Sequence, residues 1–253
     1  MSALLKDIVN FSNKLLKVGR VNDYCPNGLQ VEGAPQVKKI IGGVTASQDL
    51  IDSAIEQQAD AILVHHGYFW KGESASIVGM KRNRLKALLS NDISLIAYHL
   101  PLDMHPEVGN NAQLANLLGI EVLGPLDPSS SKSVGNVGEL ATGMMVDDFA
   151  NLLELKLGRA SQHIPGNSPL IKTVAWCTGA AQGMIDLAVQ QNVDAYISGE
   201  ISEPTVLTAR ETGVHYFAAG HHATEKGGVK SLGLLLAEEF DIEFHFVDID
   251  NPV

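Results

Sequence analysis

The sequence predicts an α/β protein in which parallel or mixed sheets are covered by helices, arranged as two similar α/β units. Apolar stretches such as residues 61–64 lack the alternation of a half-exposed strand, which indicates strands covered on both faces. Segments with apolar residues at helical spacing lie between these stretches, so strands and helices alternate along the chain. The balance of 45% hydrophobic and 19% charged residues is typical of a globular protein with an ample core.

Local patterns place the elements of the first half. Apolar residues at helical spacing from Leu4 to Leu16 predict an N-terminal amphipathic helix. Ser47 stands where an N-cap would begin a helix over about 48–58, and Gly119 stands where a helix from residue 110 would end. The stretches "NGLQVEG", "KKIIGGVTA", "ADAILVHH" and "SLIAYH" predict strands, and residues 80–90 predict a further helix.

The alternation resumes after a stretch rich in Pro, Ser and Gly. Residues 124–137, "GPLDPSSSKSVGNV", are the best sequence signal for a domain boundary. Beyond it the pattern predicts helices over 147–157, 182–191, 203–212 and 222–239, and strands at "LIKTVAWC", "VDAYIS", "VHYFAA" and "IEFHFVDI".

A weak internal repeat connects the two halves. Residues 38–66 align without a gap with residues 172–200, with nine identities in 29 positions. Either the segment is duplicated, or two strand–helix–strand units are alike because they obey the same packing rules. The aligned segments differ at their ends, where His65 and His66 are aligned with Gly199 and Glu200.

Composition excludes several classes of function. The formal net charge of −11 disfavours a nucleic-acid partner. Only Cys25 and Cys177 are present, far apart in sequence, which excludes a thiolate zinc site and a disulfide scaffold. The first residues lack the features of a signal peptide and no apolar stretch is long enough to span a bilayer, so we expect a cytoplasmic protein without a membrane partner.

Polar residues that suit metal binding follow three of the predicted strands. In open α/β sheets, ligands bind beyond the carboxyl ends of the strands. These positions hold the following residues: His65 and His66; His99, Asp103 and His105; and His221, His222 and Glu225. If the strands share one sheet, all three segments project at the same edge.

His221 and Glu225 are four residues apart and would lie on one face of a helix, where they could hold one ion. A first-turn capping arrangement is the simpler explanation of that pair. His65 and His66 are adjacent, and adjacent strand residues point to opposite faces, so each would serve a different ion of a dinuclear centre or be structural. Three imidazoles with the carboxylates of Asp103 and Glu225 suit zinc, manganese, iron or nickel.

At these residues the sequence resembles a known family. "NGLQVEG", "ADAILVHHG", "AYHLPLD", "DAYISGE" and "GHHATE" occur in the order and spacing of the Nif-three-like dinuclear-metal proteins, which are often named GTP cyclohydrolase type 2 homologues. The resemblance covers essentially the whole chain. It implies two interleaved α/β domains, a metal-binding domain of residues 1–127 with about 214–253, formed by both chain ends, and a central domain of about 128–213. It also implies a homohexamer built as a trimer of dimers.

The resemblance further implies a site of two divalent metal ions. Its ligands, matched motif by motif, are His65, His66, Asp103, His221 and Glu225. His99 matches a histidine often close to the site. Two departures stand beside the ligands: Gly67 replaces a common proline, and His222 stands where a tyrosine is frequent.

Two functions agree with these residues. The first is a metal-dependent hydrolase that uses a bridging water or hydroxide on a nucleotide or another small phosphorylated or heterocyclic substrate, with His99 or His222 as proton shuttle. The second is a non-catalytic metal-binding, metal-trafficking or regulatory scaffold protein. Phe69 and Trp70 suit either stacking on a substrate ring or packing at a subunit contact. No phosphate-binding glycine motif independently supports a nucleotide.

Overall fold

The computed structural model describes residues 2–253 and divides them into two compact units. Unit 1 consists of residues 2–102 with Gly228–Asp250, and unit 2 consists of Asp103–Gly227 with Asn251–Val253. The chain therefore leaves unit 1 and later returns to it, as the interleaved fold class predicts. The helices of residues 2–253 include none that is long and apolar enough to cross a membrane.

Unit 1 contains a five-stranded sheet in the order β13-β4-β5-β6-β2. Strands β13, β4, β5 and β6 are parallel, and β2 is antiparallel at the edge. Its elements are β1 (Ala3–Leu4), α1 (Leu5–Leu15), η1 (Val18–Arg20), β2 (Gly28–Val31), β3 (Gln36–Val37), β4 (Lys39–Thr45), α2 (Gln48–Glu56), β5 (Ala61–His66), α3 (Gly79–Ser90), β6 (Ser94–Ala97) and β13 (Glu243–Phe246). Helix α4 (Leu100–Met104) leads out of this unit and α10 (Lys226–Phe240) leads back into it.

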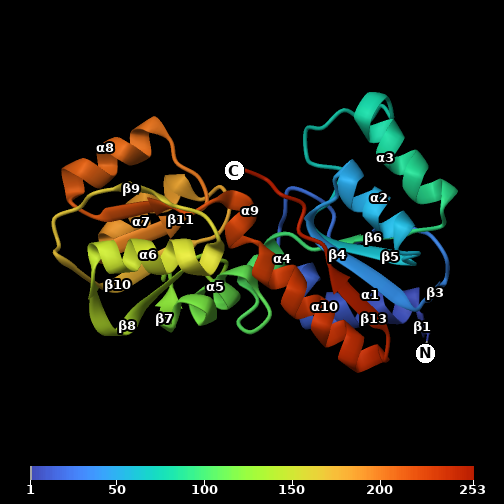
Figure 1. Ribbon diagram of the computed structural model, residues 1–253, viewed down its shortest axis with the longest axis horizontal. Coiled ribbons are helices and arrows are strands. Elements are labelled where there is room, and N and C mark those ends of the chain that lie inside the picture. Colours follow the sequence, from blue (N-terminus) through green and yellow to red (C-terminus); the bar gives the residue numbers. More distant parts are fainter. Residues whose placement is uncertain (1) are drawn as a thin grey trace. The chain divides into compact units, whose positions relative to one another are not determined.

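Helices cover both faces of this sheet, with α2 and α3 on one side and α1 and α10 on the other (Figure 1). Two adjacent glycines of β4 show how close the layers lie. A Cβ at Gly43 would stand 2.5 Å from Leu50 of α2, and one at Gly42 would stand 3.1 Å from Val229 of α10. Strand β5 is buried on both faces as a result, which confirms the interpretation of its unbroken apolar run.

Unit 2 contains a six-stranded sheet in the order β7-β8-β10-β11-β12-β9. Strands β10, β11 and β12 are parallel, and the outer strands are antiparallel. Its elements are α5 (Asn110–Leu118), β7 (Ile120–Pro125), β8 (Asn136–Met145), α6 (Val146–Leu157), β9 (Gln162–Ile164), β10 (Leu170–Cys177), η2 (Gln182–Met184), α7 (Ile185–Gln190), β11 (Ala195–Ser198), α8 (Glu203–Thr212), β12 (His215–Ala218) and α9 (His221–Thr224). One core joins Phe149 of α6 to Phe217, and a second core joins Ile185 of α7 to Tyr216 on the opposite face.

The expected start and stop signals operate as predicted. The Ser47 side chain accepts a hydrogen bond from the Leu50 backbone N–H at 3.2 Å and so caps α2. Gly119 ends α5 with a φ of 69°, in the left-handed region where glycine is favoured. The predicted helix over 222–239 is two helices, α9 and α10, which separate at Glu225.

The units divide the chain at other positions than the predicted boundaries near residues 127 and 213. The Pro-, Ser- and Gly-rich residues 124–137 join β7 to β8, which pair as an antiparallel hairpin within unit 2. Strand β12 pairs with β11 in the same sheet, so residues 214–227 also belong to unit 2. The composition of residues 124–137 therefore reflects a hairpin loop.

The internal repeat is present in the structure. The Asp60 carboxylate accepts hydrogen bonds from the backbone N–H groups of Lys38 and Lys39, and its aligned partner Asp194 accepts them from residues 172 and 173. Gln58 and its aligned partner Asn192 share a left-handed φ, of 55° and 53°. Strand β5 pairs with β6 in the same register as β11 with β12. The two sheets are thus built on one plan.

Candidate metal centre

Three histidines gather at the carboxyl edge of the sheet in unit 1. His65 and His66 end β5, and His99 follows β6 after one residue. One ring nitrogen of each lies within 4.8 Å of those of the other two. The centroids of the His65 and His66 rings are 4.5 Å apart, so the two adjacent histidines lie close together at this edge.

Each of these imidazoles is held through its Nδ1 atom by a different partner. His65 Nδ1–H donates to the carbonyl oxygen of Tyr98 at 2.9 Å. His66 Nδ1 hydrogen-bonds the Thr45 hydroxyl at 3.1 Å, on the opposite neighbouring strand. His99 Nδ1–H donates to the Asp23 carboxylate at 2.7 Å. Metal-binding histidines are commonly held through one ring nitrogen in this way, which leaves the other to face the metal.

Asp23 is a residue of this edge that the sequence did not single out. Its side chain is only 3% exposed, and it accepts hydrogen bonds from His99 Nδ1, Asn27 Nδ2 and the backbone N–H groups of Tyr24 and Leu100. Burial alone would raise the pKa of Asp23, but the hydrogen bonds from His99 and Asn27 outweigh it and lower the pKa to about 2. The only sequence signal was its place in the turn "NDYCPNG".

Neither cysteine offers a thiolate. Burial, and then the Asp23 charge, raise the pKa of Cys25 to about 12. Burial, followed by the charges of Asp103 and Glu225, raises the pKa of Cys177 well above its usual value. Both side chains are therefore protonated at neutral pH, although Cys25 lies with Asp23 and His99 in one of the groups that could hold an ion.

Phe69 and Trp70 have different surroundings. Phe69 adopts a left-handed φ of 65°, packs against the core of unit 1 and lies 5.0 Å beneath the Lys81 ammonium. The Trp70 ring lies 5.0 Å from that of His99 and 6.0 Å from that of His66, and its Nε1–H donates to the Gly67 carbonyl. Of the two aromatic residues, Trp70 is the one beside the histidines.

In unit 2, two carboxylates and a histidine gather beyond the strands. His221 begins α9, and its Nε2 is 3.1 Å from Glu225 Oε2, which realises the predicted four-residue pair. A carboxylate oxygen of Asp103 lies within 4.8 Å of one of Glu225. Both carboxylates are buried, at 5% and 3% exposure. Asn110 Nδ2 donates to Asp103 Oδ1 at 2.9 Å and orients that side chain.

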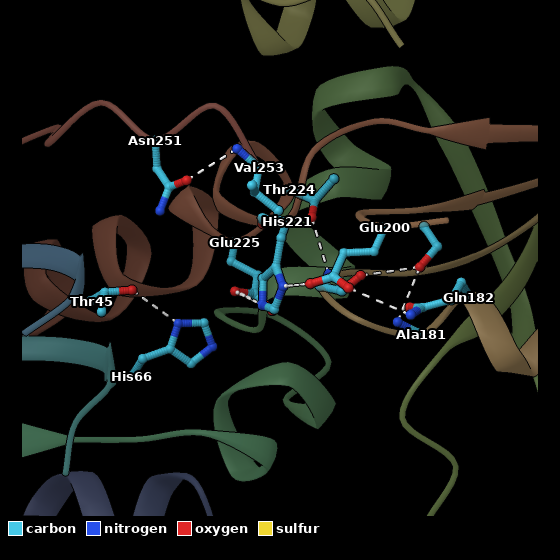
Figure 2. A network of polar contacts seen from close by, with 12 residues as sticks. Thr45, His66, Ala181, Gln182, Glu200, His221, Thr224, Glu225, Asn251 and Val253 are labelled. Carbon is cyan, nitrogen blue, oxygen red and sulfur yellow. Dashed lines mark hydrogen bonds and ion pairs between the residues drawn. The ribbon is translucent and has the colours of Figure 1, made fainter. Parts of the chain in front are cut away.

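His221 lies between two carboxylates. Its Nδ1 is 2.6 Å from Glu200 Oε1, and Figure 2 shows the side chains of Glu200, His221 and Glu225 pointing toward one another. Burial alone would lower the pKa of His221, but the hydrogen bond and charge of Glu225, and then those of Glu200, raise it to about 9. The two carboxylates therefore favour a positive charge at His221, which the ring carries as a proton when no metal ion is bound.

Two other histidines that follow the predicted strands, His105 and His222, have different contacts. Within residues 2–253, the groups of side chains suited to hold an ion include neither His222 nor His105. The His222 backbone N–H donates to the Val253 carbonyl at 2.9 Å. His105 Nδ1 accepts from the backbone N–H groups of Glu107 and Val108, each at 3.2 Å. His105 therefore shapes the turn before α5.

The donor atoms fit divalent metal ions. Imidazole nitrogens and buried carboxylate oxygens form the set that zinc, manganese, iron and nickel accept. Unit 1 holds three histidines of this kind, and unit 2 holds Asp103, His221 and Glu225. The fold and these clusters define the class, a two-sheet α/β protein with side chains suited to bind metal.

Comparison with known proteins identifies the family within that class. The family model Duf34/NIF3 (NGG1p interacting factor 3) matches residues 3–252, so the chain belongs to the DUF34/NIF3 family. It is 56% identical over 252 residues to a protein of Pseudomonas aeruginosa named GTP cyclohydrolase 1 type 2 homolog, covering 100% of both chains. It is 57% identical over 241 residues to a protein of the same name from Haemophilus influenzae, covering 95% of this chain and 96% of the other.

Solved structures agree. A structure described as protein ybgI, of unknown function, superposes with a TM-score of 0.95 at 50% identity and covers 99% of this chain and 100% of its own. A protein from Thermus thermophilus superposes with a TM-score of 0.90 at 30% identity, over the same shares of the two chains. The family and fold expected from the sequence are confirmed.

Proposed function

We propose that the protein binds two divalent metal ions through His65, His66, Asp103, His221 and Glu225, and that it is a metal-dependent hydrolase. The observation that supports this most is the anchoring of histidines through Nδ1, since it prepares Nε2 for a metal before any metal arrives. The name GTP cyclohydrolase 1 type 2 homolog, carried by the relatives, supports a nucleotide or other small phosphorylated or heterocyclic substrate.

Two divalent ions, when bound, supply Lewis acidity and a nucleophile of lowered pKa. The protein's own groups supply the proton transfers. His99 Nδ1–H is held by the Asp23 carboxylate, so Nε2 is the atom that takes or gives a proton. We assign no such role to His222, which belongs to none of the donor groups found in the described chain.

Trp70 is the residue we propose to contact a planar substrate. Its ring lies beside those of His66 and His99, where a flat heterocycle would meet both the aromatic surface and the proposed proton donor. Phe69 packs against the core of unit 1 and is given no such role.

The test is metal content followed by turnover. The purified protein is stripped, reconstituted with zinc or manganese, analysed for metal per chain and assayed on GTP and generic phosphoesters. His66→Ala should lose metal and turnover, whereas His245→Ala, at an exposed histidine of unit 1, should keep both. Less than one ion per chain after reconstitution contradicts the dinuclear site. Two ions without turnover on any substrate would favour the non-catalytic metal-binding or metal-trafficking protein.

We also propose that the protein is a homohexamer, as the family resemblance implies, and that it has a small-molecule substrate and no nucleic-acid partner. Native mass spectrometry tests the assembly, for which a mass of six chains is expected. A monomer at micromolar concentration would contradict it.

A further inference from the structure

Glu200 occupies a constrained position at the edge of unit 2. Its own carbonyl accepts a hydrogen bond from the hydroxyl of the buried Tyr216. The preceding Gly199 donates its N–H to the Gly179 carbonyl at 2.8 Å, and a Cβ on Gly199 would stand 2.6 Å from His221 Cα. The backbone just after β11 therefore approaches α9 as closely as only a glycine allows, and Glu200 lies directly beside the His221 ring.

The Glu200 carboxylate contacts the side of the imidazole that faces away from Glu225. Glu200 Oε1 is 2.6 Å from Nδ1 of His221, and Glu225 Oε2 is 3.1 Å from Nε2 (Figure 2). A carboxylate accepts and does not donate, so Glu200 keeps a proton on Nδ1. Nε2, which faces Glu225, is the nitrogen from which a metal ion would displace a proton.

The two carboxylates also differ in exposure. The Glu200 side chain is 32% exposed, whereas that of Glu225 is 4% exposed. The other Glu200 oxygen, Oε2, lies 3.5 Å from the Gln182 amide nitrogen. Glu200 is thus bound to the ring and to a neutral amide, which suits a residue that orients a ligand.

We infer that Glu200 is a positioning residue, which fixes the orientation and tautomer of His221 and so sets the affinity of the site for its metal ion. The inference rests on the proposed metal binding by His221. Partners of this kind typically change metal affinity by about 10- to 100-fold when they are removed.

The experiment measures Zn²⁺ affinity of the full chain by competition with a chelator. Glu200→Ala should bind the ion that His221 holds about 10- to 100-fold more weakly than the original chain. Glu200→Gln should lose only a few-fold, because the glutamine oxygen still accepts from Nδ1–H. Glu203→Ala, at an exposed carboxylate three residues further on, is the matched control and should change nothing.

A second readout separates positioning from a general loss of fold. In the Zn²⁺-loaded protein, the Nδ1–H proton of His221 should be visible by NMR in the original chain and in Glu200→Gln, and should exchange rapidly in Glu200→Ala. Unchanged Zn²⁺ affinity of Glu200→Ala, or equal losses in Glu200→Gln and Glu200→Ala, would overturn the inference, the second by making Glu200 a ligand itself. His221→Ala distinguishes the failures: if it also binds Zn²⁺ normally, the proposed metal site has failed.

Discussion

Strand β5 of unit 1 ends in His65 and His66, whereas the equivalent strand β11 of unit 2 leads into Gly199 and Glu200. Both strands lie between two parallel neighbours, and their pairings with the following strand have the same register. The same frame therefore presents imidazoles in one unit and carboxylates with one histidine in the other. The chemistry of each edge is decided by a few residues at the end of the strand or just after it.

The residues that face these ends differ in a matching way. Thr45 of unit 1 holds the His66 ring through its hydroxyl. Its aligned partner in unit 2 is Gly179, which has a φ of 70°, and a Cβ there would stand 2.1 Å from Glu225 Oε1. In unit 1, a side chain orients a proposed metal ligand. In unit 2, the absence of a side chain leaves space for a proposed metal ligand.

The largest expected effect is on the free energy of unfolding. It distinguishes the carboxylates that hold a histidine at each edge, Asp23 in unit 1 and Glu200 in unit 2. Asp23→Ala removes the buried acceptor of His99 and of two backbone N–H groups, so we expect a loss of about 3–5 kcal/mol in the free energy of unfolding. Glu200→Ala in unit 2 should cost less than about 1 kcal/mol, because that side chain is 32% exposed. Urea unfolding of the metal-free proteins measures both changes.

Asp23→Asn is the control for this pair. The asparagine oxygen still accepts a hydrogen bond, so most of the stability should return while the charge is absent. Equal losses for Asp23→Ala and Glu200→Ala would show that the two anchors are alike in energy, and the contrast between a buried and a partly exposed anchor would be abandoned.

Gly179→Ala tests the space that unit 2 provides. The positive φ disfavours an alanine and the new Cβ overlaps Glu225 Oε1, so we expect about 2 kcal/mol of destabilisation and at least about tenfold weaker metal binding. Gly183→Ala, where a Cβ would meet nothing within 4 Å, is the matched control. Metal binding by Gly179→Ala at the original strength would mean that Glu225 does not need its observed position.

Most of the fold was predictable from the sequence because its signals are local. The cap at Ser47, the stop at Gly119 and the unbroken apolar run of β5 each act within a few residues of where they are read. The hairpin of β7 and β8 was missed, because loop composition does not reveal whether the flanking strands pair with each other. Pairing is a long-range property, and the domain boundary depended on it.

The part of the site that could be predicted from the sequence is the part that residue types reveal. Histidines and carboxylates after strands are visible in sequence, as the pairing of His221 with Glu225 confirms. Asp23 was not singled out, and Glu200 was noted only as the residue aligned with His66. Each acts through a histidine, 76 and 21 positions away in the sequence. The closeness of the His65 and His66 rings was also not predicted, although His66 is still paired with Thr45 of β4.

The pH dependence of metal binding tests the carboxylate-rich edge. The pKa of His221 is raised to about 9 in the absence of metal, so the protonated ring contributes stability below its ordinary pKa of 6.5 that is lost as pH rises through about 9. A metal ion must displace that proton. Between pH 7 and 9, affinity should therefore rise about tenfold per pH unit and level off above. Calorimetry in buffers of different ionisation enthalpy should detect one released proton, and a constant affinity over this range would contradict the assignment.

The smallest expected effect belongs to Thr45, the anchor at the histidine edge. Thr45→Val keeps the shape and removes the hydroxyl that holds His66 Nδ1 at 3.1 Å, which should weaken metal binding by about 0.5–1.5 kcal/mol, or about two- to tenfold. Thr45→Ser should restore the affinity because the hydroxyl returns. If both variants bind metal like the original chain, the hydroxyl does not orient His66. The two edges would then differ only in their metal-donor atoms, and not in how neighbouring residues orient those atoms.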